Sequence, residues 1–197
     1  TEQAWKKRLE QPMPAAPHLA FKGLMETFQL AEIHVRDLDK SIRKLCETNK
    51  AFQVVESIPG VGPVTRAALA AHLFDIERFA TGKQVVSYFG LCPASYDSGD
   101  RERKGRITRE GSPIVRALLV ECAQQARRTN HPLNAFYRRY VGRHGYKKAC
   151  VAIAAKLCRI VHGMVKRQER FSPEALGVKW NKEGKRWEID REIRRAS

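Results

Sequence analysis

The spacing of hydrophobic residues predicts helices along most of the chain. Between residues 24 and 45, apolar residues recur at alternating steps of four and three, which is the repeat of a coiled-coil seam. We therefore expect residues 21–53 to form a helix that pairs with another helix, within the chain or between chains, giving a dimer or a higher oligomer. The alternative is one amphipathic helix packed on its own domain. The seam consists of Leu24, Phe28, Ala31, Val35, Leu38, Ile42 and Leu45, with Phe52 further along.

The second half of the chain has strong helix signals. Ser112 followed by Pro113 is a typical helix start, with a capping hydroxyl and a proline in the first turn. An apolar face follows, and the helix should end near residues 130–132. Residues 132–141 predict a short helix that Gly142 and Gly145 interrupt, and residues 146–168 are apolar around much of the helix, as in a core helix. The predicted apolar face after Ser112 consists of Ile114, Ala117, Leu118, Cys122 and Ala126.

Period-2 alternation is almost absent, so the predicted fold class is mostly α: a coiled-coil helix followed by a small helical domain. Residues 1–20 carry three prolines and are interpreted as a linker. Residues 171–197 are polar and basic, and we expect a tail with a short hairpin or a terminal helix. The predicted organisation is a linker (1–20), a dimerisation helix (21–53), a helical domain (54–170) and a basic tail (171–197).

The charge changes this picture. The 197 residues include 37 Lys and Arg against 21 Asp and Glu, a formal net charge of +16. That excess is larger than solubility requires and favours a nucleic-acid partner. A membrane partner is not expected, because the apolar runs fall far short of the ~20 residues of a membrane span.

The start of the chain and its cysteines indicate the compartment. The sequence does not begin with methionine and has no secretory signal, so we interpret it as a processed form or a fragment of a cytoplasmic protein. Its five cysteines are odd in number and include no CxxC pair, which favours reduced thiols and argues against structural zinc.

Residues 57–64 read SIPGVGPV and lie between two helical patterns. This is the sequence form of a helix-hairpin-helix. The turn at Gly60 and Gly62 would let backbone N–H groups and the next helix N-terminus face a phosphate. A plain tight turn between two helices is the alternative.

Residues 90–120 contain the most distinctive stretch, a Ser-Gly pair followed by a glycine-spaced basic run. The cap role explains Ser112, whereas Ser98 has no such structural reason and lies in a predicted loop. A serine hydroxyl is a weak nucleophile until a base or metal activates it, and arginines could neutralise charge that develops on a phosphate. The alternative is a solvated turn serine. We expect the nucleic-acid contacts to come from Arg101, Arg103, Lys104, Arg106, Arg109 and Arg116.

Three ordered motifs carry a family resemblance. IPGVGPVTRAALAAHL is followed by YFGLCPASYDSGD and then by KGRITREGSPIVRALLVECA. Together they resemble the C-terminal transposase domain of the insertion-sequence-110 family, which are DEDD transposases with a RuvC-like domain, a serine nucleophile and a bridge RNA. The resemblance covers roughly residues 52–170, and the heptad segment resembles the coiled-coil linker of that family.

The resemblance implies a mechanism. Ser98 would attack the scissile DNA phosphate and form a phosphoserine link, and a guide RNA would pair with donor and target DNA. In this family the acidic tetrad that binds Mg²⁺ lies in a RuvC-like domain that this sequence lacks. We therefore expect no cofactor in this segment, Mg²⁺ in the RuvC-like domain of the full-length protein, and no activity of the segment alone.

Two other functions remain open. The first is a non-catalytic helix-hairpin-helix module that grips DNA or structured RNA while Ser98 is a bystander. The second is a purely structural oligomerisation segment, which the net charge favours least.

Overall fold

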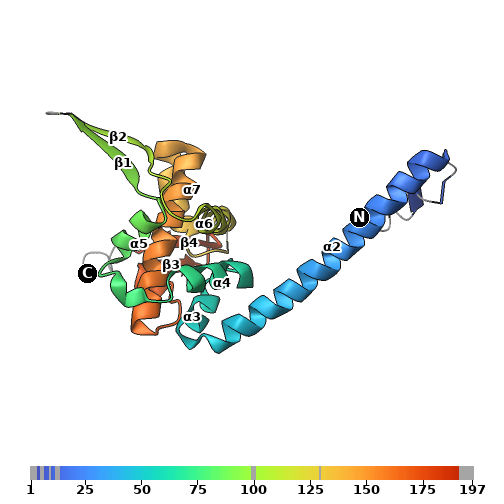
Figure 1. Ribbon diagram of the computed structural model, residues 1–197. Helices are drawn as coiled ribbons and strands as arrows, with labels where there is room; N and C mark the ends of the chain where they lie inside the picture. Colours follow the sequence, from blue (N-terminus) through green and yellow to red (C-terminus); the bar gives the residue numbers. More distant parts are fainter. Residues whose placement is uncertain are drawn as a thin grey trace. The chain divides into compact units, whose positions relative to one another are not determined.

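The computed structural model describes residues 4, 7–8, 10–11, 14–98, 101–128 and 130–190. For residues 50, 51, 95–98 and 101–104 only the backbone is described. The chain divides into two compact units, residues 1–44 and 45–197. As predicted, the fold is mostly α (Figure 1).

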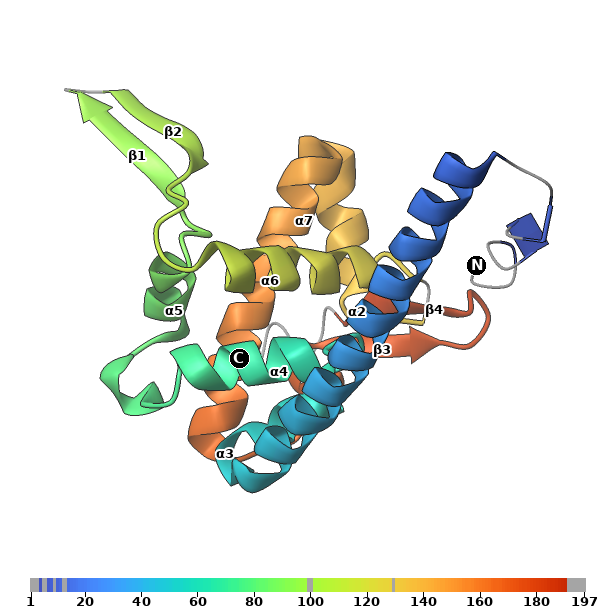
Figure 2. The same ribbon diagram turned by 45° about the vertical axis from the view of Figure 1, so that its right-hand side comes forward.

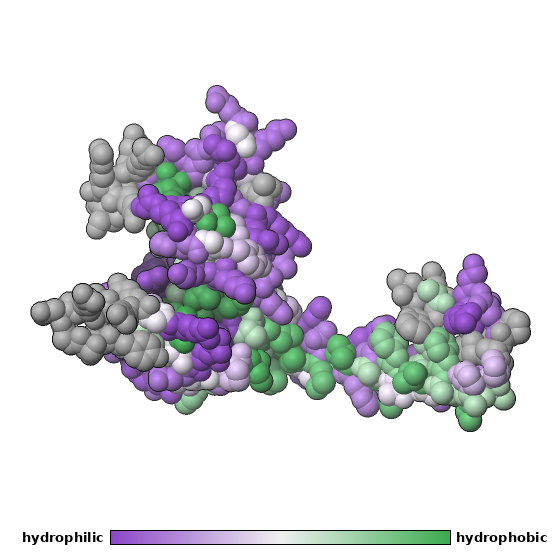
Figure 3. Space-filling model, turned by 90° about the horizontal axis from the view of Figure 1, so that it is seen from above, coloured by the Kyte–Doolittle hydropathy of each residue, from purple (hydrophilic) through white to green (hydrophobic). Residues whose placement is uncertain are grey.

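Helix α2 (Ala15–Thr48) runs through the described part of the first unit, and its last turn belongs to the second. It begins six residues before the predicted helix start at residue 21, because Pro17 falls in its first turn, where proline is tolerated. Seam residues Leu24 and Leu38 are 69% and 62% exposed. Figure 3 shows hydrophobic side chains along this helix. Phe52 is not part of the seam: it lies in α3 (Lys50–Gln53) and is buried in the core of the second unit.

The second unit is built around one long helix. Helix α7 (Asn134–Arg167) departs from helical geometry at Gly145, where φ is +76°, as predicted, whereas Gly142, the other predicted interruption, lies within the helix. Its second half buries Ile153, Leu157 and Val161. The elements packed around this core are α4 (Pro63–His72), α5 (Gly82–Tyr88) and α6 (Pro113–Gln125), which are labelled in Figure 2, and the short helices η1 (Val54–Ser57) and η2 (Ile76–Arg78).

The start of α6 confirms the predicted cap, but its buried face differs from the prediction. The Ser112 hydroxyl accepts a hydrogen bond from the backbone N–H of Val115 at 3.4 Å. The buried side begins at Val115 and Leu119, whereas Ile114 is 68% exposed. Cys122 and Ala126 of the predicted face are buried as expected, so only the first turns of the helix differ, where Val115 and Leu119 are buried while Ile114 and Ala117 are exposed.

The basic stretch that contains Ser98 is a β-hairpin, not the predicted loop. Strand β1 (Pro93–Ser98) pairs antiparallel with β2 (Arg101–Ile107), and Ser98 lies opposite Arg101. In the views of Figures 1 and 2 the hairpin projects away from the helices of its unit. Both strands are mostly polar, so neither carries the apolar alternation by which strands are recognised.

The base of this hairpin is a joint in which two backbone segments touch. Gly90 (φ +63°) and Gly111 (φ +77°) both adopt left-handed conformations. A Cβ added at Gly90 would lie 2.3 Å from the Glu110 carbonyl oxygen, and one at Gly111 would lie 2.0 Å from that of Tyr88. Only glycine permits this approach. Arg116 of α6 closes the joint by donating from Nη1 to the carbonyls of Phe89 and Glu110, each at 3.1 Å.

The C-terminal segment is more structured than a tail. After η3 (Glu174–Leu176), strands β3 (Val178–Asn181) and β4 (Arg186–Ile189) form a second antiparallel hairpin. Val178 is fully buried, and Arg138 of α7 donates a hydrogen bond to the Trp187 carbonyl. This agrees with the hairpin alternative of the sequence prediction and attaches residues 178–190 to the helical body.

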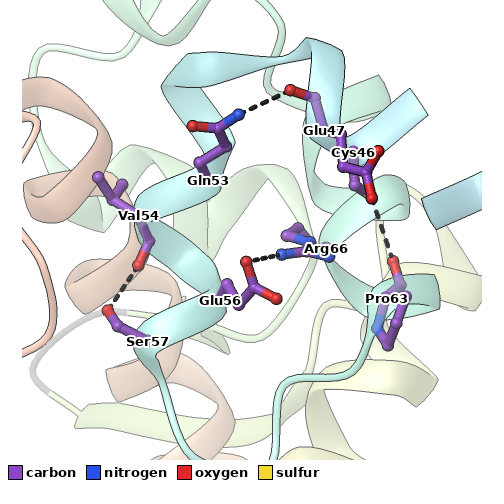
Figure 4. Close-up of polar contacts among 8 residues, drawn as sticks. All are labelled: Cys46, Glu47, Gln53, Val54, Glu56, Ser57, Pro63 and Arg66. Atoms are coloured by element: carbon purple, nitrogen blue, oxygen red, sulfur yellow. Dashed lines mark hydrogen bonds and ion pairs between the residues drawn. The ribbon is translucent and has the colours of Figure 1, made fainter. Parts of the chain in front are cut away.

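The turn between η1 and α4 is held from both sides. On one side, Nη1 of the buried Arg66 pairs with Glu56 at 2.7 Å, and the Cys46 thiol contacts the Pro63 carbonyl (Figure 4). On the other side, the buried His131 bonds through Nε2 to the Pro59 carbonyl at 2.8 Å, and its Nδ1 accepts from the Leu133 N–H at 3.0 Å. A neutral imidazole with its proton on Nε2 satisfies both contacts.

Gly111→Ala tests the hairpin joint. The added methyl group would overlap the Tyr88 carbonyl, so we expect destabilisation on the order of 2–4 kcal/mol. Gly142→Ala is the matched control, because open space surrounds its Cβ position in α7. That change should stabilise the fold by about 0.5–1 kcal/mol. Chemical denaturation measures both, and equal effects would contradict the joint.

His131 should make stability depend on pH. Burial lowers the pKa of His131 below its ordinary 6.5, opposed by the hydrogen bond to Pro59. The unfolded chain therefore binds the proton more readily, and stability should fall as pH drops below about 6.5. His131→Gln should flatten this part of the melting-temperature profile. An unchanged profile in the variant would show that other groups are responsible.

Candidate nucleic-acid interface

Ser98 is the last residue of β1, at the end of the projecting hairpin. Its partner in the predicted pair, Gly99, lies outside the described residues. Successive strand residues occupy opposite faces, so the register places Ser98, Arg101 and Arg103 on one face of the ribbon. Asp97, opposite Glu102, falls on the other face. The hairpin thus groups a hydroxyl position with cationic positions and separates it from its neighbouring carboxylate.

The predicted cationic residues fall into two groups. Arg101, Arg103, Lys104 and Arg106 belong to β2, and Arg109 follows it; the side chains of Arg106 and Arg109 are exposed. Arg116 is instead half-buried and occupied by the two carbonyls at the joint. Arg116 therefore has a structural role, because its hydrogen bonds hold the base of the hairpin.

The two glycines of the Gly60 turn are not equivalent. Gly60 has φ +78° and lies beside Gln125 and His131, so it needs glycine. Gly62 has φ −79° and open space around its Cβ position, so it does not need glycine for its conformation. No side chain caps the N-terminus of α4, and Val64 in its first turn is 44% exposed. This leaves a solvent-facing helix N-terminus, which favours an anion such as phosphate.

Helix α7 adds a cationic surface that the sequence analysis did not single out. Its 34 residues include nine Lys and Arg and no Asp or Glu. The signal was available in the sequence as a helix without carboxylates. Lys166 pairs with Glu77 at 3.4 Å, and Arg167 pairs with Glu169 at 2.6 Å. The nine residues are Arg138, Arg139, Arg143, Lys147, Lys148, Lys156, Arg159, Lys166 and Arg167.

Other kinds of site find little support in the described parts of the chain. They contain no group of three or more His, Cys, Asp or Glu placed to hold a metal ion. All five cysteines are free, and burial raises the pKa of the Cys158 thiol to about 12, so it is not a thiolate at neutral pH. No helix among the described residues is long and apolar enough to cross a membrane.

Similarity to a known protein family covers the first part of the second unit. Residues 52–138 match the family described as Transposase IS116/IS110/IS902 family. This range contains α4, α5, the Ser98 hairpin, α6 and the beginning of α7. It therefore includes both the glycine joint and the Gly60 turn.

Several whole proteins are also similar. The transposase for insertion sequence element IS1111A of Coxiella burnetii is 28% identical over 70% of this chain and 39% of its own length. A probable family 20 transposase of Pseudomonas aeruginosa is 25% identical over 82% of this chain and 49% of its own length. A putative transposase of Sinorhizobium fredii is 29% identical over 80% of this chain and 43% of its own length.

The chain thus spans two fifths to one half of the length of these relatives. The matched residues contain all three motifs that carry the resemblance, and they lie in the basic helical unit. Residues 52–138 are therefore similar to the transposase family IS116/IS110/IS902, and the similarity to that family model covers less than half of the chain.

Proposed function

We propose that this chain is the DNA-binding part of an insertion-sequence transposase and that Ser98 is its nucleophile. The observation that carries the proposal is the placement of Ser98, at the end of a cationic ribbon that a backbone joint fixes to the helical body. Charge stabilisation at a phosphate requires groups held in advance at the place where charge develops. A hairpin anchored by Gly90, Gly111 and Arg116 supplies such a support.

The proposed step is a phosphoryl transfer. The Ser98 hydroxyl loses its proton to a base and its oxygen bonds to phosphorus, while the bond from phosphorus to one deoxyribose oxygen breaks. That oxygen leaves as a hydroxyl after it takes a proton. The strand stays joined to the protein as a phosphoserine until a hydroxyl of another strand reverses the step. Cations on the Ser98 face, Arg101 and Arg103, are placed to lower the charge on the phosphate.

By register, Asp97, the neighbouring carboxylate, is on the face of the ribbon opposite to Ser98. We therefore infer that the base that accepts the Ser98 proton comes from another part of the full-length protein. Among the described residues, no group of three or more His, Cys, Asp or Glu is placed to hold Mg²⁺. The RuvC-like domain that the family resemblance implies would hold that ion in the full-length protein, and this segment alone would be inactive.

The nucleic acids would be held by shape and charge. The N-terminus of α4 and the cations of α7 suit phosphates, and such contacts position a duplex without reading its sequence. Donor DNA, target DNA and a guide RNA paired with them would all present such phosphates.

A second function is favoured by the same surfaces. The Gly60 turn and α7 do not involve Ser98, so they could serve a non-catalytic module that grips DNA or RNA. Both functions require the basic surface to bind nucleic acid. They differ in the effect of removing the Ser98 hydroxyl, which abolishes strand cleavage only if Ser98 is the nucleophile.

Ser98→Ala should separate them. In the full-length protein with its RNA and Mg²⁺, it should abolish the covalent protein–DNA adduct on a denaturing gel and leave DNA binding intact. Ser112→Ala is the matched control: it removes the cap of α6 and costs about 1 kcal/mol of stability, but the adduct should remain. An adduct that persists in Ser98→Ala would identify another nucleophile. Absence of an adduct in active wild-type protein would favour the binding module.

The exposed seam of α2 should pair with a second copy of the chain. Leu38→Lys with Ile42→Lys would place charge in the paired helices and should give monomers by light scattering. Thr27→Lys with Ser41→Lys adds the same charge at exposed positions beside the seam and should leave the oligomer intact. A wild-type monomer at high protein concentration would rule out pairing between chains.

A further inference from the structure

The C-terminal hairpin carries two tryptophans directly opposite each other. Trp180 of β3 pairs in register with Trp187 of β4. Their rings are 5.4 Å apart between centroids, with an angle of 67° between planes. A cross-strand aromatic pair of this kind stabilises a hairpin, and that is its simplest explanation.

Hairpin stability does not account for the exposure of Trp180. Val178, two residues earlier on the same face, is fully buried and anchors the strand, whereas Trp180 is 39% exposed. An isoleucine or threonine would pair across the strands without presenting a large flat ring to water. The exposed ring is therefore available to a ligand with a flat apolar surface.

The charges around this ring point to a ligand with phosphates. Residues 178–189 contain four cations and two carboxylates. Two of the cations are paired locally: Lys179 with Asp190 at 3.2 Å and Arg186 with Glu188 at 2.8 Å. Lys182 and Lys185 are exposed at the turn. On α7, Arg139 and Arg143 follow Arg138, which holds the Trp187 carbonyl.

The hairpin is held in place before any ligand binds. Its turn is closed by a hydrogen bond from the Gly184 N–H to Asn181 Oδ1 at 2.9 Å. Its base is closed by one from the Asp190 N–H to the Gly177 carbonyl at 2.8 Å. Because these bonds and the Arg138 contact fix both ends, binding would cost little ordering of the backbone.

We propose that Trp180 and the turn lysines form a stacking platform for an unpaired base of single-stranded nucleic acid. The base would stack on the exposed face of Trp180, and Lys182 and Lys185 would contact the adjoining phosphates. Stacking on aromatic rings between cations is how proteins hold single strands without reading their sequence. The proposal goes beyond the strand-transfer function and does not depend on Ser98.

Intrinsic fluorescence tests the platform directly. The chain has three tryptophans, so Trp5→Phe leaves only the hairpin pair as reporters. Titration with short oligo-dT or oligo-U should quench this emission, and a blunt duplex should not, because its bases are already stacked on one another. Preference between the two oligomers tells whether the natural ligand is DNA or RNA.

Matched substitutions separate stacking from folding. Trp180→Leu should weaken single-strand binding about 5- to 150-fold, whereas Trp180→Phe should recover most of the affinity. Lys182→Glu with Lys185→Glu should weaken binding and make it less sensitive to salt. Circular dichroism and thermal unfolding confirm that each variant is folded. If Trp180→Leu is folded and binds as tightly as wild type, or if duplex quenches as strongly as single strands, the proposal is wrong.

Discussion

The contact between two backbone segments at Gly90 and Gly111 is the constraint on which the candidate site depends. A hairpin whose strands are both polar cannot attach itself to a protein by burying side chains, because it has few apolar ones to bury. This chain attaches the hairpin through the backbone at its base. There the Glu110 carbonyl lies close to Gly90 and the Tyr88 carbonyl lies close to Gly111, and both glycines have left-handed conformations. Arg116 then bonds both sides of the joint from a helix that is packed in the core.

This arrangement explains how a basic stretch can be both exposed and positioned. Each cation that faces a nucleic acid must stay in water before binding, so it cannot contribute to the core. The structure therefore separates the two tasks. Cys92 contacts both Ser87 and Thr108 near the joint, at 3.6 and 3.7 Å, and Arg116 holds carbonyls, while Arg106 and Arg109 remain exposed. Helix α7 shows the same separation around its circumference, with Ile153 and Leu157 inside and cations outside.

The sequence predicted those features that depend on local chemistry. The cap at Ser112, the interruption of α7 at Gly145 and the mostly helical fold all follow from single residues or short patterns. The sequence-based prediction was wrong where two local arrangements fit the sequence equally well. In the first turns of α6, apolar residues lie on neighbouring stripes through Ile114 and through Val115, and packing of the helix against α4 and α7 buries the second stripe. The Ser98 hairpin was missed because a polar ribbon has no hydrophobic period, and the glycines that anchor it read as loop signals.

The same limit applies to the candidate site. The sequence identified the residues of the site, but it did not show how these residues lie relative to one another. Asp97 is next to Ser98 in the sequence, yet strand geometry places the two residues on opposite faces of the hairpin. Gly60 and Gly62 looked alike as a pair, yet only Gly60 has a backbone conformation that requires glycine.

The surfaces proposed to bind nucleic acid differ in what they can recognise, and this bears on how the chain would work. The α4 N-terminus and the cations of α7 respond to phosphate, which every nucleic acid carries, whereas a stacking surface at Trp180 responds only to bases that are out of a duplex. A protein that exchanges strands must distinguish paired from unpaired segments at each stage. Phosphate contacts alone cannot do so. A charged surface combined with an exposed ring can, because the ring adds binding energy only where a base is free to leave its neighbours.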